Sequence, residues 1–471
     1  MFKKLIQNTI IYSIAPYVAS FSNLLILPII TKDLTEIDYG ISGTITAYTG
    51  ALSALSALGL SVILSNSFFK SRVQYKYLWR QIYGFLTIWN ILYSVILGVF
   101  LYIFIPDSAS ENRLTIILLS TLPNALLGPS NFLGTYYYTF RQEALPIGLR
   151  TMIFGVLSVF LNLLFISHYK LGYMGWFYTS FIISLLTNFS FWYVLIFKLN
   201  MMPIFNFKRK TIIKALRISL PLIPHQYSYY LLSGSERLIM DQCKIDTGKI
   251  GEFNIGSMFS NYVSNIAQAA STSIGPVIMI YFREQKFNQA RNLLFLYQAI
   301  LLIVNFIICL WAKEAFYILI QNDILKETYD LALILIMSIT FSPLFSGYYL
   351  LLTFNAETKS LWRITFVAGL LCVVLNLIFL PTYGIFSSAL IFFFAYAYRG
   401  LAGYYLNSFR RINKVKFYPI IWTIIITAFT IIVYLLRNAS IASKAAITLL
   451  ILALLIGLYI KRVDLKKAYL E

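Results

Sequence analysis

The strongest constraint in this sequence is a succession of long apolar runs that continues from one end of the chain to the other. A bilayer core about 30 Å thick needs roughly 20 apolar residues for one helical crossing. Because unpaired backbone polar groups are not tolerated in lipid, each run is expected to form a helix. The fourteen predicted spans lie near residues 7–31, 40–64, 82–105, 114–138, 147–167, 174–197, 218–240, 255–281, 293–312, 331–354, 364–380, 384–408, 418–436 and 446–460. The last two are the shortest, and twelve spans is the alternative count.

Composition supports the same fold class, an all-α integral membrane protein. Hydrophobic residues make up 59% of the chain, charged residues 12%, and the mean hydropathy is +0.74. A soluble globular protein carries about 25% charged residues. The net charge of +20 would suggest nucleic acid in a soluble protein, but here the charges form short clusters between apolar runs, so no nucleic-acid partner is expected.

The distribution of charge predicts the orientation. When both termini are placed in the cytoplasm, most of the 38 Lys and Arg residues fall in cytoplasmic segments, and most acidic residues fall in outer loops. An excess of Lys and Arg on alternate loops is the positive-inside signal of multi-pass proteins. The sequence therefore predicts a multi-pass protein of the cell inner membrane with both termini cytoplasmic.

The two halves of the chain repeat each other. Phe140–Glu143 and the later Leu161–Ile166 have counterparts 214 residues on, in Phe354–Glu357 and Leu375–Leu380. At nearly the same offset, the segment 37–43 resembles 250–256. Six helices per unit give both halves the same orientation, which is the parallel-repeat plan of some transporters. Chance similarity between apolar helices is the alternative.

This repeat predicts two six-helix lobes around a central cavity, followed by two further helices. The expected boundaries are 1–199 for the N-terminal lobe, 200–412 for the C-terminal lobe, and 413–471 for the two additional helices and a cytoplasmic tail.

Ionisable residues inside an apolar span are costly and are functional candidates by default. The predicted seventh helix carries four of them, and we interpret Glu236, Asp241 and His225 as ion-coupling candidates. Arg237 is a candidate phosphate contact, because guanidinium offers paired donors and keeps its charge. The alternative is that Glu236 and Arg237 lie at the outer end of the helix and pair structurally.

Three further arginines lie near the cytoplasmic ends of predicted spans five, eleven and twelve. Arg150 and Arg363 occupy nearly equivalent places in the two repeats, and Arg399 follows in the next span. Together they would suit a cationic lining around a cavity. Snorkelling of the long side chains to lipid headgroups explains them equally well.

No catalytic signature accompanies these residues. The sequence holds no P-loop, metalloprotease helix or nucleophile elbow, and its three cysteines and two histidines show no metal-ligand spacing. We therefore expect a transport protein without metal or cofactor, and not an enzyme.

The pattern resembles the O-antigen/polysaccharide flippases, the polysaccharide transporter family of the multidrug/oligosaccharidyl-lipid/polysaccharide flippase superfamily. The resemblance rests on Leu27–Gly40, Leu220–His225, Ser233–Arg237 and Leu375–Gly384, and spans almost the whole chain. Family members more often have Asp-Arg where this chain has Glu236 and Arg237, which is a conservative departure.

The resemblance implies a flippase for an undecaprenyl-diphosphate-linked oligosaccharide, working by alternating access and driven by H⁺ or Na⁺. Membrane lipids, a polysaccharide polymerase and a chain-length regulator are the other partners it implies. A multidrug or small-molecule exporter of the same superfamily is one alternative. A membrane polysaccharide polymerase or ligase is another, but short, acidic outer loops argue against it.

Overall fold

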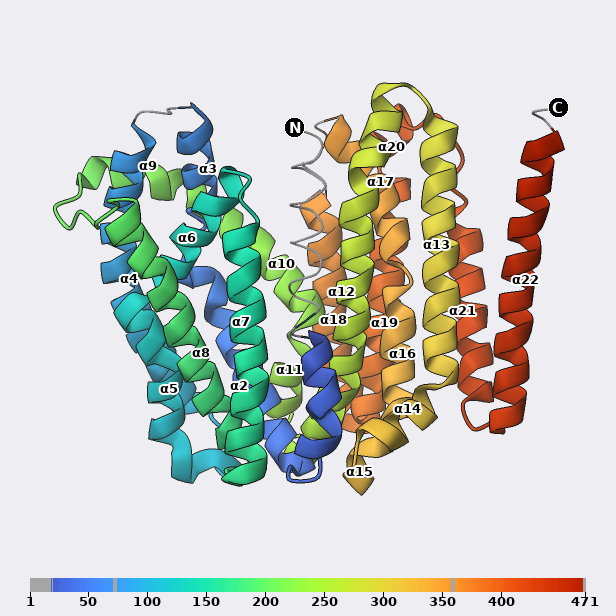
Figure 1. The fold of residues 1–471 in the computed structure, drawn as a ribbon, viewed down its shortest axis with the longest axis horizontal. Coiled ribbons are helices and arrows are strands. Elements are labelled where there is room, and N and C mark those ends of the chain that lie inside the picture. Colours follow the sequence, from blue (N-terminus) through green and yellow to red (C-terminus); the bar gives the residue numbers. More distant parts are fainter. Residues whose placement is uncertain (1–17, 19, 71–73, 356, 358–360, 469–471) are drawn as a thin grey trace.

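A computed structural model describes residues 18, 20–70, 74–355, 357 and 361–468. All regular elements in these ranges are helices, as expected for a chain that must satisfy its backbone hydrogen bonds inside lipid. They form two bundles side by side, with the last two helices at the far edge of the second bundle (Figure 1). The prediction of an all-helical, two-lobe fold is confirmed.

The first lobe is built around α5, which packs against both α4 and α8. Trp79, Tyr83 and Tyr137 lie at the centre of its aromatic core. A break at Gly128 and Pro129 bends α5 from α6 by 55°, because Pro129 has no N–H to continue the helical ladder. The helices of this lobe are α2 (Glu36–Ser56), α3 (Ser61–Lys70), α4 (Tyr75–Phe104), α5 (Arg113–Leu127), α6 (Pro129–Phe140), α7 (Leu145–Asn162) and α8 (Met174–Tyr193).

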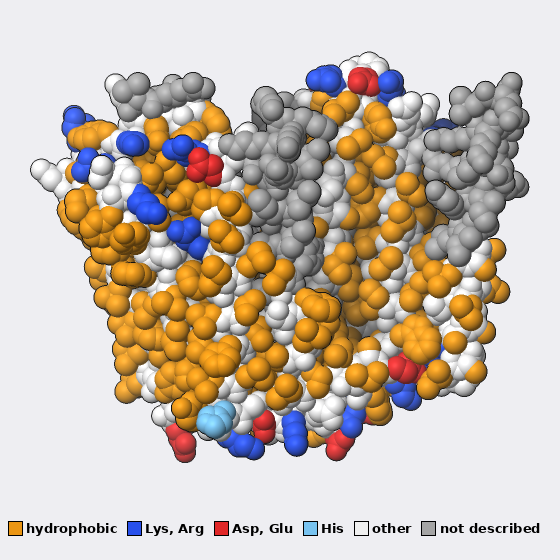
Figure 2. All heavy atoms as spheres, in the orientation of Figure 1, with side chains coloured by type: hydrophobic (Ala, Val, Ile, Leu, Met, Phe, Trp, Pro, Cys, Tyr) orange, Lys and Arg blue, Asp and Glu red, His pale blue; other side chains and the backbone are white. Residues whose placement is uncertain are grey.

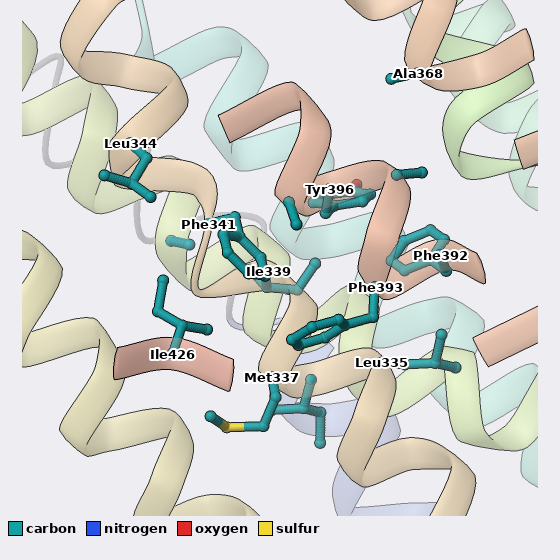
Figure 3. Packing of buried hydrophobic residues seen from close by; sticks show 14 of the residues in the cluster. Leu335, Met337, Ile339, Phe341, Leu344, Ala368, Phe392, Phe393, Tyr396 and Ile426 are labelled. Atoms are coloured by element: carbon teal, nitrogen blue, oxygen red, sulfur yellow. The ribbon is translucent and has the colours of Figure 1, made fainter. Parts of the chain in front are cut away.

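The second lobe is centred on α16, an apolar helix that is buried on all sides. Figure 3 shows Leu335, Ile339 and Phe341 from this region packed beside Phe393 and Tyr396. A helix that is apolar all round belongs in the core of a bundle. This lobe contains α12 (Thr247–Arg283), α13 (Phe287–Leu310), α16 (Tyr329–Ile339), α17 (Ser342–Phe354), α18 (Leu361–Tyr383) and α19 (Ile385–Ala402).

Two C-terminal helices complete the second bundle, α21 (Pro419–Leu436) and α22 (Ile441–Ala468). Lys444 at the start of α22 is fully buried, and its Nζ lies 2.7 Å from Glu314 Oε1 of α14 (Ala312–Leu319). Arg437 pairs with Asp330 at 2.8 Å. These two ion pairs fix the α21–α22 hairpin to the lobe at one end.

Three helices connect the bundles: α9 (Arg209–Ser219), α10 (Ile223–Ser233) and α11 (Glu236–Gln242). α9 packs on α3 and α4 of the first lobe, whereas α10 and α11 pack on α18 of the second and also touch α2. The backbone N–H of Lys208 donates to Gln81 Oε1 at 3.1 Å. The segment 201–219 therefore lies against the first lobe, beyond the predicted boundary at residue 199, and the domain limits stay a prediction.

Among the described residues, ten helices are long and apolar enough to cross a membrane, and eleven if the bent pair α5–α6 is one span. The predicted count of fourteen is thus not confirmed. The predicted span 218–240 is interrupted in the structure, because α10 ends at Ser233 and α11 starts at Glu236. Ser20–Ile30 and Ile441–Leu454 are shorter apolar helices. Part of the first predicted span lies outside the described residues.

Charged side chains lie mainly near the two ends of the helices and apolar side chains lie between them. Apolar side chains cover the middle of the face shown in Figure 2, and charged side chains gather above and below. Basic α9 and α20 (Asn407–Ile412) lie at the upper end in Figure 1, and α14 and α15 (Asp323–Lys326) lie at the lower end. This arrangement is that of a protein with an apolar belt and two polar caps.

Candidate functional site

The two lobes meet through α2 and α12, which approach each other unusually closely. A Cβ on Gly251 would lie 1.8 Å from the Glu36 carbonyl oxygen, and a Cβ on Gly40 would lie 1.9 Å from the Thr247 carbonyl oxygen. Only glycine permits this approach of two backbones. Across the same contact, Asn254 Nδ2 donates to the Tyr39 carbonyl at 3.0 Å.

The contact joins the two segments that the sequence repeat relates, 37–43 and 250–256. Local sequence places both helix starts here. Thr35 and Asp38 form a reciprocal capping box at the start of α2, and Asp246 Oδ1 accepts from Gly248 N at 2.9 Å at the start of α12. The repeat thus marks a lobe–lobe seam, which we call the glycine seam (Gly40, Gly251 and their contacts).

A group of hydrogen bonds between α2 and the helices α10 and α11 adjoins the glycine seam. Tyr48 of α2 donates its hydroxyl to Asp241 Oδ2 at 2.5 Å, and Gln242 Nε2 donates to the same hydroxyl at 2.6 Å. Tyr230 of α10 donates to the Ala47 carbonyl at 2.7 Å. Asp241, a predicted ion-coupling residue, therefore joins the first lobe to α11.

The interrupted seventh span brings two ionisable residues into the second lobe. The helix breaks at Gly234 and Ser235, and the Ser235 hydroxyl donates back to the Leu231 carbonyl at 2.7 Å. Glu236 and Arg237 follow at the start of α11. Irregular backbone at membrane depth is tolerated where protein or a water-filled cavity surrounds it.

A cavity of about 200 Å³ lies at this break. Its wall contains Glu236 and Arg237, together with a polar stripe on α12. The stripe is formed by Ser257, Ser260, Asn261 and Ser264, which share one face at helical spacing. Tyr229, Phe392 and Tyr396 supply aromatic surface. The cavity thus combines one acid, one guanidinium, hydroxyl and amide groups, and aromatic rings.

Arg237 is only partly satisfied by its surroundings. Its Nη2 donates to Ser257 Oγ, and its guanidinium carbon lies 5.9 Å from the centre of the Phe253 ring. Its buried Nε finds no hydrogen-bond partner among the described residues. A buried donor without a partner is costly, so this guanidinium is poised to bind an acceptor.

Glu236 is only 2% exposed and faces α18. Its Oε1 lies 3.9 Å from Cys372 Sγ, which in turn lies 3.5 Å from Asn376 Nδ2. Asn376 Oδ1 is buried and has no hydrogen-bond partner in the described ranges. The Cys372 thiol therefore lies between the Glu236 carboxylate and the side-chain amide of Asn376, whose oxygen has no partner in the described ranges.

Arg399 lies beside the cavity but does not line it. Its guanidinium packs 3.9 Å from the Phe345 ring centre, and lies 6.0 and 5.7 Å from the cavity-lining Tyr229 and Tyr396 rings. Its Nε is buried and unpartnered within the described part of the chain. Arg237 thus lines the cavity, and Arg399 lies behind two of its aromatic side chains.

The other predicted site residues are placed differently. Arg150 lies inside the first lobe, where Nε donates to Ser190 Oγ at 2.8 Å, Nη1 to the Pro146 carbonyl at 2.7 Å, and Nη2 to the Ser190 carbonyl at 3.3 Å. Arg363 is exposed near the start of α18. The side chain of His225 lies outside the described part of the structure. The structure places Glu236 and Arg237 in one cavity and Arg399 next to its aromatic side chains, and leaves Arg150 and Arg363 elsewhere.

Two parts of the site have no counterpart among the predicted site residues. The stripe on α12 shows in the sequence as Ser and Asn at positions i, i+3, i+4 and i+7, which is a readable signal. Cys372 gives no such signal, because its proximity to Glu236 depends on how α11 packs against α18.

Two helical lobes, an interrupted span and a polar cavity in apolar surroundings define a membrane transporter fold. The chain belongs to the polysaccharide biosynthesis protein family, whose pattern matches residues 5–282. A search of curated sequences found no significant match.

Solved structures extend the likeness over nearly the whole chain. A lipid II flippase, MurJ, in an inward closed conformation is 14% identical with a TM-score of 0.67, over 92% of this chain and 98% of that one. An inward-facing multidrug resistance MATE family transporter of the MOP superfamily is 14% identical with a TM-score of 0.57, over 91% and 96%. A MOP superfamily transporter from Pyrococcus furiosus is 15% identical with a TM-score of 0.54, over 91% and 96%. The shared fold is that of flippases and transporters, in agreement with the prediction that the chain is not an enzyme.

Proposed function

We propose that this protein is a flippase that moves a lipid-linked oligosaccharide, joined to undecaprenyl by a diphosphate, across the cytoplasmic membrane by alternating access. The observation that carries the proposal is the pairing of the second-lobe cavity with Arg237, whose Nε lacks a partner among the described residues. A diphosphate-sugar headgroup cannot cross hydrocarbon unaided, because burying unpaired charge is very unfavourable.

Substrate chemistry supports this choice of headgroup. Arginine binds phosphate oxygens with charge-assisted hydrogen bonds, which are roughly twice as strong as neutral ones. The serine and asparagine stripe of α12 offers hydrogen-bonding groups for sugar hydroxyls, and Tyr229 and Tyr396 offer ring faces. The surface glycan is proposed to be O-antigen or a similar repeat unit, made available to a polymerase and chain-length regulator after transfer.

The glycine seam supports an inward-facing state with the outer end closed. α2 and α12 touch at the end where acidic Asp33, Glu36 and Asp38 lie, opposite the basic α9. By the positive-inside rule the basic end is cytoplasmic, which corresponds to an inner-membrane protein with both termini inside. Opening outward then requires separation of the glycine seam.

Ion coupling is proposed to run through Glu236. Its buried carboxylate, close to Cys372 and Asn376, is positioned to bind a proton or Na⁺ and to change the net charge of the cavity beside Arg237. Asp241 contacts Tyr48 of the other lobe, so its titration would act on the lobe contact.

The test is transport of a fluorescent undecaprenyl-diphosphate oligosaccharide in proteoliposomes that contain the full chain. The expected result is inside-to-outside transfer that depends on an imposed H⁺ or Na⁺ gradient and that is lost in Glu236→Gln. In cells that lack the protein, complete lipid-linked units should accumulate on the inner leaflet. Efflux of cationic drugs without transfer of the lipid-linked sugar would support the exporter alternative and reject the proposal.

A further inference from the structure

A second cavity, separate from the central one, lies at the basic end of the second lobe. It has a volume of about 500 Å³ and lies between η6 (Gly403–Tyr405), α20 and the start of α21. It shares no lining residue with the cavity of Glu236 and Arg237. We call it the interfacial groove, and its wall is mainly aromatic and aliphatic: Tyr404, Tyr405, Phe409, Phe417, Tyr418 and Ile420.

The inner wall of the groove is preformed. The rings of Tyr404 and Phe409 lie 5.1 Å apart, and those of Tyr404 and Phe417 lie 5.5 Å apart. Tyr404 also donates its hydroxyl to the Leu344 carbonyl at 2.9 Å, which fixes its ring against α17. Apolar cavities with rigid walls bind apolar groups without the cost of ordering the wall.

The outer side of the groove is formed by exposed residues at the start of α21, which is one of the candidate membrane spans. Ile420 is 55% exposed, and Tyr405 and Tyr418 are about half exposed. The chain turns into α21 through Tyr418, whose φ of +49° lies in the left-handed region, directly before Pro419.

Four cations lie in the chain segment that forms the groove, and this segment contains no acid. Arg410, Arg411, Lys414 and Lys416 lie in or beside the segment 403–422, which contains no Asp or Glu. Arg411 pairs with Glu357, and Lys414 Nζ donates to Gln285 Oε1 at 3.0 Å.

Arg410 and Lys416 are exposed and have no ion pair among the described residues. The Arg410 guanidinium lies 5.5 Å from the ring of Tyr405, a groove residue, so its charge is held at the rim.

We infer that the interfacial groove is a binding site for an anionic phospholipid, with one acyl chain in the aromatic groove and the phosphate on Arg410 and Lys416. An apolar slot that opens to the membrane fits a hydrocarbon chain, and unpaired cations at an interface attract anionic headgroups. The inference is independent of the proposed transport function, because it rests on residues outside the central cavity.

Native mass spectrometry of the purified full-length protein tests this, with phosphatidylglycerol or phosphatidylcholine of the same acyl chains as probes. Phosphatidylglycerol should bind more tightly, and removal of each rim cation should weaken its binding about fivefold. The double variant Arg410→Ala/Lys416→Ala is compared with Lys208→Ala/Arg209→Ala, which removes the same charge from the exposed start of α9.

A third variant, Ile420→Trp, keeps the rim charges but narrows the groove, and it should also lower binding. Equal losses in the rim and α9 variants, unchanged binding in Ile420→Trp, or equal affinity for the two lipids would overturn the inference. Displacement of phosphatidylglycerol by an equimolar polyprenyl diphosphate would also overturn it, and would assign the groove to a substrate-type lipid.

Discussion

The two lobes share a helical plan, but Arg150 in the first lobe and Arg237 and Arg399 in the second differ in how far their surroundings satisfy them. In the first lobe, Arg150 directs all three guanidinium nitrogens to Ser190 and Pro146 of the same lobe, and its carbon lies 4.5 Å from the Phe191 ring centre. In the second lobe, Arg237 and Arg399 each keep a buried Nε that has no partner in the described ranges. The first arginine holds helices together, and the other two have capacity left for a ligand.

The two halves therefore share a backbone plan but not the polar groups that line a cavity. The glycine seam uses equivalent segments of both halves, so both repeats contribute to the lobe contact. The polar cavity, by contrast, has no lining residue from the first lobe. Substitutions at these positions test whether the two lobes differ in this way.

The largest effect is expected for Arg237→Ala. Removing a charge-assisted contact to substrate phosphate costs about 1.5–3 kcal/mol, which corresponds to roughly a 10- to 150-fold loss of transport rate. The measurement is flipping of the lipid-linked oligosaccharide in proteoliposomes. Arg237→Lys should recover part of the rate, since it restores the charge without the planar fork. Arg217→Ala, on the exposed face of α9, is the control. A similar loss of transport rate there would show that the effect of Arg237→Ala is not specific to the cavity.

The next effect is expected for Gly251→Ala. The added methyl group would overlap the Glu36 carbonyl oxygen, so the glycine seam cannot close as it does here. Overpacking costs about 1–3 kcal/mol, a population shift of roughly 5- to 150-fold toward the outward-open state. Labelling of Asn254→Cys by an impermeant maleimide measures that shift. Gly275→Ala in the same helix is the matched control, because its Cβ would lie 3.7 Å from a Leu350 methyl group, an ordinary contact.

A smaller effect is expected for Tyr48→Phe. This change removes the hydroxyl that contacts Asp241 and Gln242. Because Asp241 is half-buried and Gln242 is exposed, water can replace the lost partner, and the two bonds together contribute about 1 kcal/mol. The outer end should open more often, and maleimide labelling of the same cysteine should rise by less than in Gly251→Ala. Unchanged labelling would show that the glycine seam alone closes the outer end.

The smallest effect on transport is expected for Arg150→Ala. Loss of its hydrogen bonds within the first lobe should destabilise the protein by about 1–3 kcal/mol, seen as a lower midpoint of thermal unfolding. The transport rate per folded molecule should change by no more than about twofold, because Arg150 makes its contacts within the first lobe and does not line the cavity. A transport loss as large as that of Arg237→Ala would place Arg150 in the cationic lining after all.

Much of the site could be read from the sequence, and the remainder depended on packing. Glu236 and Arg237 stand out because ionisable residues are rare in apolar spans. The break that positions them did not stand out, since Ser233, Gly234 and Ser235 are also tolerated within continuous membrane helices. Arg150 and Arg363 look equivalent in the sequence, yet one meets Ser190 and the other lies exposed.

The sequence by itself determined that the chain forms apolar helices in two similar halves, because the need to pair every backbone group in lipid leaves few other structures. It also determined which spans carry ionisable groups. Which of those groups are satisfied and which remain available follows from the packing of the helices. That depends on contacts between distant residues, such as Arg237 with Ser257, Glu236 with Cys372, and Tyr48 with Asp241. Helical periodicity fixes the face on which a side chain lies, but the neighbour it meets is set by how whole helices cross.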